Sequence, residues 1–321
     1  MRWVLIVLIA LAFPVEAQET PAWFSESLLD LREDVAEAAA QGKRVMLYFG
    51  QDGCPYCKRL MEVNFRQEAI AAKAQKHLVA LALNIWGDRE VTWTDGQAST
   101  EKQLAARLKV QFTPTLIFLD ERGAVALRVN GYYPPHHFDA ALDHVTGKIS
   151  FDEFLKRQRS AGASASLNPQ PFLLPPPYDL RRKRGAKPLA VLLETPHCAQ
   201  CDELHAVVYR RQEVLKQLAG FDVYRFSVSG TDALIAPDGS KTSAASWAQA
   251  LKVGYVPTIL LFDAGGREVF RAEAYLRPFH VAGALEYVSS GAYRSEPSFQ
   301  RFLQLKAERL RDSGSRVDLW N

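Results

Sequence analysis

The chain has 321 residues, 48% of them hydrophobic and 23% charged, and a formal net charge of +3. This length predicts about two globular domains, and the composition is that of chains that bury a core. A net charge this small does not point to nucleic acid or a membrane surface as the main partner, so we expect no nucleic-acid partner. Only four residues are cysteine, and they fall into two C-x-x-C pairs, Cys54/Cys57 and Cys198/Cys201.

The N-terminus has the pattern of a secretory signal peptide. Arg2 precedes an apolar run over residues 3–13, and small residues at Val15 and Ala17 suit cleavage after residue 17. The run is shorter than the about 20 residues that span a bilayer, and no later stretch is long enough, so we expect no stable membrane insertion. Residues 1–17 are predicted to be a cleaved signal peptide, and the mature protein is expected in the periplasm, where disulfides persist.

Residues 18–159 are predicted to form a first domain of alternating helices and strands. Apolar residues at helical spacing end at Gly42, a β-prone run follows, and a later strand turns back at Gly123. In chain order we expect a helix, strand, helix, strand, helix, two hairpin strands and a helix, at about 24–41, 44–50, 55–75, 77–85, 101–109, 112–119, 124–129 and 135–146.

The first cysteine pair opens the helix expected from about residue 55. Residues three apart at a helix start lie on one face, so a short disulfide can close and reopen there. The free N–H groups and the dipole of the helix favour a thiolate at its first residue. Cys54 is therefore the expected nucleophile and Cys57 the expected resolving thiol of a thiol–disulfide exchange site.

Residues 160–187 break the pattern and are predicted to be a linker. The stretch contains five prolines and ends in the basic run 181–184. We interpret that run as solvated charge flanking a domain; a site for an acidic partner is the alternative.

From residue 188 the first pattern starts again. Cys198 lies 144 residues after Cys54, and Pro257 lies 143 residues after Pro114. A register kept this closely indicates an internal duplication. Residues 188–292 are thus predicted to be a second copy of the domain, and 293–321 a C-terminal helical tail laid against a domain surface, without chemistry of its own.

The order of elements, the two C-x-x-C pairs and the later Thr113-Pro114 and Val256-Pro257 resemble the thioredoxin superfamily. The resemblance implies the fold class: α/β, with two tandem thioredoxin-like domains, each a central mixed sheet flanked by helices. It also implies that Pro114 and Pro257 shape substrate grooves, with Pro114 in the cis form beside the disulfide. Thr113 and Val256, the residues before these prolines, would bind the substrate backbone.

The residues around the first pair separate it from thioredoxins. Pro55 and Tyr56, between the cysteines, resemble the glutaredoxin dipeptide and indicate a less reducing site. Thioredoxins carry a buried carboxylate six residues before the nucleophile, where this chain has Tyr48 and Leu192. Proton transfer would then use water or another group, for which the sequence offers Asp52 or Glu194.

The second pair has Ala199-Gln200 between its cysteines and His197 before them. Three roles stay open for it: redox activity, with His197 supporting the Cys198 thiolate, a structural disulfide, or a soft-metal site. The other histidines of interest, His136, His137 and His280, are interpreted as capping or surface residues.

The leading functional hypothesis is an exported thiol:disulfide oxidoreductase, whose only redox groups are its own two disulfides, without a cofactor or bound metal. The polar inserts with Asp95-Gly96 and Asp238-Gly239 resemble the SoxW-type periplasmic thioredoxins associated with sulfur oxidation. Expected partners are periplasmic protein thiols or disulfides, and a reductase would also need a membrane electron donor of the DsbD kind. The alternatives are a redox-inert tandem binding module, or a copper-handling protein that uses the second pair.

Overall fold

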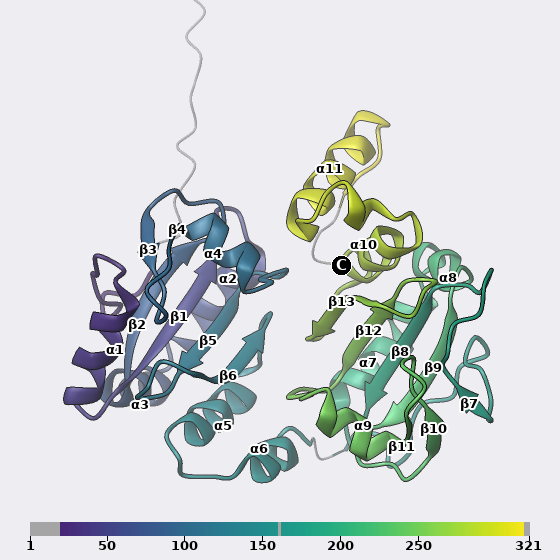
Figure 1. Cartoon of the computed structure of the whole chain (residues 1–321), viewed down its shortest axis with the longest axis horizontal. Coiled ribbons are helices and arrows are strands. Elements are labelled where there is room, and N and C mark those ends of the chain that lie inside the picture. The colour runs from purple at the N-terminus through teal and green to yellow at the C-terminus, as the bar shows by residue number, and fades with distance from the viewer. Residues whose placement is uncertain (1–19, 160–161, 318–321) are drawn as a thin grey trace, which may run out of the picture.

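The computed structural model describes residues 20–159 and 162–317, so the expected signal peptide lies outside the described residues. The chain forms two α/β domains that lie side by side (Figure 1). The first is built on a four-stranded sheet in which β1 pairs in parallel with β2 and antiparallel with β5, and β5 pairs with β6. The order across the sheet is β2 (Leu78–Asn84), β1 (Arg44–Gly50), β5 (Thr115–Leu119) and β6 (Val125–Asn130).

Helices cover both faces of this sheet, and two of them depart from the sequence expectation. The first helix starts at Leu31 instead of near residue 24, because Asp30 caps it and Leu28 is 97% exposed. The helix expected at 55–75 is divided, since Gln67 is extended and starts a new helix. The helical segments are α1 (Leu31–Ala40), α2 (Pro55–Arg59), the π-helical η1 (Leu60–Asn64), α3 (Glu68–His77), α4 (Glu101–Arg107), α5 (Pro135–Val145) and α6 (Phe151–Arg157).

The second domain repeats the sheet with the same order and directions, which confirms the duplication. Across it lie β13 (Glu268–Glu273), β12 (Thr258–Phe262), β8 (Leu189–Glu194) and β9 (Asp222–Ser227). Its helices are α7 (Ala199–Ala206), the short η2 (Val208–Arg210), α8 (Gln212–Leu218), α9 (Ala244–Ala250) and α10 (Pro278–Ser289). The polar inserts form short strands in both copies, β3 (Glu90–Thr92) and β4 (Ala98–Thr100) in the first, β10 (Ala233–Ile235) and β11 (Lys241–Ser243) in the second.

The C-terminal part of the predicted linker, which was expected to extend to residue 187, is folded into the second domain. β7 (Tyr178–Asp179) pairs with β10, and Leu180 is fully buried. The basic run that follows is not uniformly solvated, because the side chain of Arg182 is 4% exposed and pairs with Asp222 at 2.7 Å. The linker prediction was therefore too long, because apolar residues of this stretch pack on the second domain: Leu180, after the last proline, lies in its core, and Phe172 and Leu173 are partly buried against it.

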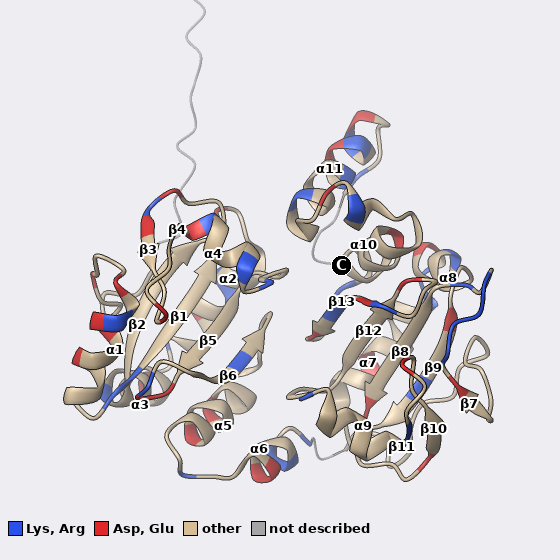
Figure 2. Ribbon diagram, in the orientation of Figure 1, with Lys and Arg blue, Asp and Glu red and all other residues tan. Residues whose placement is uncertain are grey.

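The C-terminal tail forms η3 (Ala292–Arg294) and α11 (Phe299–Asp312). Phe299, Phe302 and Leu303 are buried in the core of the second domain, while the helix also faces the first domain (Figure 1). The helix α11 carries both basic and acidic residues, with Lys and Arg the more frequent, whereas the central strands of both sheets carry few charges (Figure 2). No helix within residues 20–159 and 162–317 is long and apolar enough to cross a membrane.

The two domains exchange aromatic side chains at their interface. Phe112, from the first domain, packs in the core of the second, with its ring 5.3 Å from that of Phe270. Tyr255, the equivalent residue of the second domain, is fully buried in the core of the first and stacks on Tyr133 at 4.1 Å. Because each of these residues stands two positions before a cis-proline, the exchange fixes both proline loops against the opposite domain.

Candidate active site

The first disulfide lies where β1 passes into α2. Gly53 has a φ of 69° and turns the chain, so that Cys54 caps the helix and Pro55 occupies its first turn. Cys54 and Cys57 form a disulfide with their Cα atoms 5.2 Å apart. Cys57 is fully buried and Cys54 is 5% exposed, so only Cys54 can be reached from outside.

The sulfur of Cys54 is held between a backbone donor and the proline loop. The N–H of Cys57 donates to it at 3.1 Å, and the carbonyl oxygen of Thr113 lies 3.4 Å away. The Thr113–Pro114 bond is cis, as the resemblance implied. The backbone donor, together with the N-terminus of the helix, favours a thiolate at Cys54 once the disulfide is open.

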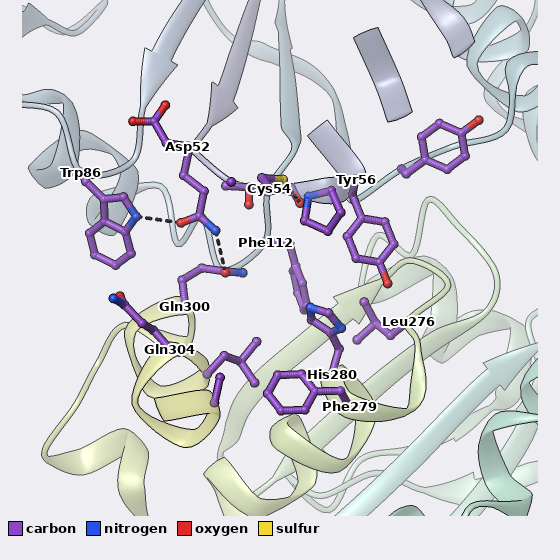
Figure 3. Close-up of a pocket in the computed structure, with 18 of the residues that line it drawn as sticks. Asp52, Cys54, Tyr56, Trp86, Phe112, Leu276, Phe279, His280, Gln300 and Gln304 are labelled. Carbon is purple, nitrogen blue, oxygen red and sulfur yellow. Dashed lines mark hydrogen bonds between the residues drawn. The ribbon is translucent and has the colours of Figure 1, made fainter. Parts of the chain in front are cut away.

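A pocket of about 430 Å³ opens beside Cys54 (Figure 3). One wall comes from the first domain and includes Thr113 and Trp86, while the opposite wall comes from α10 and α11. The tail helix, in which the sequence indicated no chemistry, is therefore part of the site. Its lining residues are Gln300, Leu303, Gln304, Ala307 and Arg311.

A chain of side-chain hydrogen bonds ties this wall to the first domain. The indole N–H of Trp86 donates to the Gln51 carbonyl oxygen at 2.7 Å, and Gln51 donates to Gln300 at 3.2 Å (Figure 3). Gln300 in turn donates to the backbone oxygen of Gln111 at 2.9 Å. These bonds fix the position of α11 over the pocket, and no local pattern in the sequence indicated them.

Aromatic and histidine side chains form the other end of the pocket. The ring of Tyr56, between the cysteines, meets that of His280 edge-on at 5.5 Å. Burial raises the pKa of Tyr56 to about 12 and lowers the pKa of His280 to about 4. His137, the equivalent of His280, is 3% exposed, with its pKa also lowered to about 4 by burial. The expectation that His137 is a capping or surface residue was wrong, because the domain interface covers it.

The second disulfide repeats the first with different neighbours. Cys198 caps α7 and its sulfur accepts from the N–H of Cys201 at 3.1 Å; their Cα atoms are 5.2 Å apart. Val256 packs against both cysteines, and the Val256–Pro257 bond is cis. His197 is exposed and has a φ of 61°, the conformation of Gly53 in the first copy.

The second copy contains a buried acid–imidazole pair that has no counterpart in the first copy. Glu194 is 1% exposed, and its Oε1 lies 2.8 Å from Nε2 of His205. Glu194 Oε2 and His205 Nδ1 are buried without a hydrogen-bond partner among the described residues. His205 follows Cys201 by one helical turn and therefore shares its face of α7.

The first copy fills the same space differently. Gly50 stands where Glu194 would be, and the hydroxyl of Tyr48 would clash with any Cβ at that position. Asp52, the acid suggested there by the sequence, is exposed. Aligning the two repeats at the duplication register could have revealed this difference between the copies.

No group of three His, Cys, Asp or Glu side chains suited to a metal ion occurs in the part of the chain that the structure describes.

A family model for the thioredoxin-like domain matches residues 31–146 and again residues 181–289. The chain belongs to the thioredoxin-like domain family. The two matches correspond to the two structural copies, each with one C-x-x-C disulfide and one cis-proline loop.

The thiol:disulfide interchange protein DsbD of Actinobacillus pleuropneumoniae serotype 5b (strain L20) is 30% identical over 115 residues, which is 35% of this chain. The match covers only 18% of that relative's length. Among solved structures, a thioredoxin-fold protein from Helicobacter pylori has a TM-score of 0.39 at 16% identity, over 44% of this chain and 93% of its own. A thioredoxin from Thermus thermophilus has a TM-score of 0.30 at 27% identity, over 37% of this chain and 85% of its own.

Proposed function

We propose that the protein is an exported thiol:disulfide oxidoreductase that exchanges disulfides with periplasmic protein thiols, and that Cys54 is its attacking residue. The observation that carries this proposal is the position of Cys54. It is the more exposed cysteine of its pair, caps α2, and borders both the cis-proline loop and the pocket. A structural disulfide needs none of these features.

The exchange step follows from this geometry. With the pair reduced, the Cys54 thiolate attacks one sulfur of a substrate disulfide and forms a mixed disulfide, and the other substrate sulfur leaves as a thiolate that takes up a proton. Cys57, deprotonated, then attacks the sulfur of Cys54 and releases the second substrate thiol. The protein disulfide is formed and the substrate disulfide is reduced by two electrons. The reverse sequence oxidises a substrate dithiol.

The surroundings of the site support this division of roles. The Cys57 N–H stays within hydrogen-bond distance of Cys54 Sγ, which stabilises the attacking and leaving thiolate. Thr113, on the cis-proline loop, presents its backbone to the pocket next to the same sulfur. A substrate thiol held against this loop would face Cys54.

The setting and partners are also part of the proposal. The match to a thiol:disulfide interchange protein supports thiol–disulfide exchange. If the first site works as a reductase, a membrane electron donor would reduce its disulfide again after each reaction. The apolar N-terminal run supports export to the periplasm. The narrower resemblance to SoxW-type thioredoxins stays a prediction.

A redox titration of each pair tests the proposal against the redox-inert alternative. The variant with Cys198→Ser and Cys201→Ser isolates the first pair, which should equilibrate with glutathione or dithiothreitol buffers above about −300 mV. A potential far below that value, typical of inert structural disulfides, would refute the enzyme proposal for this site.

A trapping experiment tests the roles of the two cysteines. Cys57→Ser should accumulate mixed disulfides on Cys54 when expressed with its natural partners, because the resolving thiol is missing. The matched variant Cys54→Ser should accumulate far fewer, since Cys57 is fully buried. Equal trapping by both variants would contradict the assignment.

A further inference from the structure

The backbone next to the second disulfide is already occupied by a side chain of the first domain. Gln158, directly after α6, is 3% exposed and reaches across the domain interface. Its Nε2 donates to the carbonyl oxygen of Gly254 at 3.2 Å, and its Oε1 accepts from the N–H of Val256 at 3.5 Å. Val256 is the residue that packs against both cysteines of the second pair.

The carboxamide of Gln158 imitates a peptide unit in this position. It offers one donor and one acceptor to a carbonyl and an N–H two residues apart, which is the pattern that an added β-strand would use. An extended polypeptide approaching Cys198 along this loop needs the same two backbone groups. Gln158 therefore competes directly with such a substrate.

The opposite side of the second site is covered as well. The N–H of His197, next to Cys198, donates to the carbonyl oxygen of Ser164 at 2.8 Å. Asp202 accepts from the Ser164 N–H at 2.8 Å and from the Asn168 side chain at 2.6 Å. Residues of the first domain and of the connecting segment thus line both sides of the second disulfide.

The first site has the same kind of glutamine but leaves its loop open. Gln300 donates to the Gln111 carbonyl, as Gln158 does to Gly254, but its oxygen accepts from Gln51 instead of from Thr113. Within the described residues, the Thr113 N–H has no hydrogen-bond acceptor. Thr113 lines the pocket beside Cys54, so its backbone remains available to a substrate.

We propose that Gln158 is a specificity-determining residue that closes the second C-x-x-C to extended polypeptides. Polypeptide disulfides then exchange at Cys54, and Cys198 exchanges with small thiols and disulfides that need no strand pairing. This inference rests on the proposed function. Cys198 is 4% exposed, close to the 5% of Cys54, so the two residues are similarly accessible to a small reagent.

At the second site, two small thiols reduce the protein disulfide in two exchange steps. A small thiolate attacks Cys198, the bond to Cys201 breaks, and the Cys201 thiolate takes up a proton. A second small thiolate attacks the sulfur of the first one and releases Cys198. The protein disulfide becomes two thiols, and two small thiols become one disulfide.

The test uses the full chain with Cys54→Ser and Cys57→Ser, in which only the second pair can react. After reduction by dithiothreitol, its reoxidation is followed with two probes, hydroxyethyl disulfide and the disulfides of insulin. We expect measurable reaction with the small probe and little with insulin. Gln158→Ala should raise the insulin rate about tenfold, since it frees two backbone hydrogen-bonding groups, and change the small-probe rate less than about twofold.

Gln158→Ser shortens the same side chain and serves as a second variant if the alanine protein folds poorly. The matched control is Gln300→Ala in the chain with Cys198→Ser and Cys201→Ser. It should not raise insulin exchange at the first site, because Thr113 is already open and the variant loosens the wall of the pocket. An increase there equal to that of Gln158→Ala would contradict the assigned difference between the loops.

Two results would overturn the inference. One is an equal rise of the insulin and small-probe rates in Gln158→Ala, or no rise in either, which would mean that Gln158 does not select by size. The other is a second pair that does not react with the small probe at all. Neither result bears on exchange at Cys54, which is measured separately in the chain that lacks the second pair. Failure of this inference can therefore be distinguished from failure of the proposed function.

Discussion

Replacing Phe112 with alanine should destabilise the domain to which Phe112 does not belong. Its ring is 4% exposed and lies 5.3 Å from Phe270 and 5.8 Å from Phe299, both in the second domain. Truncating a buried phenylalanine costs about 3–5 kcal/mol, because apolar contact is lost and a cavity remains. A loss of about 3 kcal/mol corresponds to roughly a hundredfold change in an opening equilibrium.

Hydrogen exchange followed by mass spectrometry can locate this loss. Some amides of β13 exchange only when the core of the second domain opens. In Phe112→Ala these amides should exchange roughly a hundredfold faster. Amides of β2, at the far edge of the first sheet, should change much less. The matched control is Phe118→Ala, a fully buried residue of the first core, which should reverse this ranking. If Phe112→Ala accelerated hydrogen exchange mainly in the first domain, the conclusion that Phe112 stabilises the core of the second domain would be refuted.

Three other predictions concern single side chains. Burial lowers the pKa of His137 to about 4, and an unfolded histidine titrates near 6.5, so the unfolded state binds more protons between these values. Of the fall in the free energy of unfolding between pH 6.5 and pH 4, about 3 kcal/mol should therefore come from His137, and urea titrations should show a fall smaller by about that amount in His137→Phe. His205→Met should lower the free energy of unfolding by about 2 kcal/mol, because it leaves a side-chain oxygen of Glu194 buried without its hydrogen-bond partner; a urea midpoint unchanged from the wild type would contradict this. His197→Gly should raise thermal stability slightly, by about 0.5–1 kcal/mol, because the φ of 61° suits glycine; calorimetry showing a clear loss would give His197 a structural role.

The sequence was sufficient for the features that depend on local pattern. The C-x-x-C spacing predicted both disulfides, and the spacing between Pro114 and Pro257 predicted the duplicated fold. These features repeat at a fixed register, so each copy supports the interpretation of the other. The cis form of Pro114 could be expected only through the family resemblance, because the sequence around a proline does not fix its isomer.

The features that the sequence did not reveal are contacts between distant segments. Phe112 and Tyr255 look like ordinary strand-flanking aromatics, and nothing nearby indicates that each enters the other domain. Gln158 stands in a polar stretch between a helix and a linker, where glutamine is common. The separation of 142 residues between Gln158 and Gln300, close to the duplication register, was the one available signal.

The interface explains why two copies with the same backbone can have different sites. Because each proline loop is held by the opposite domain, what lies beside each disulfide is decided by the C-terminal elements of that opposite domain. In the first site these are α10 and α11, which line a pocket next to Thr113. In the second they are α6 and Gln158, which contact the loop directly. Substitutions in these covering elements can therefore change the selectivity of one disulfide without altering its C-x-x-C motif, and this is why Gln158→Ala separates selectivity from redox chemistry.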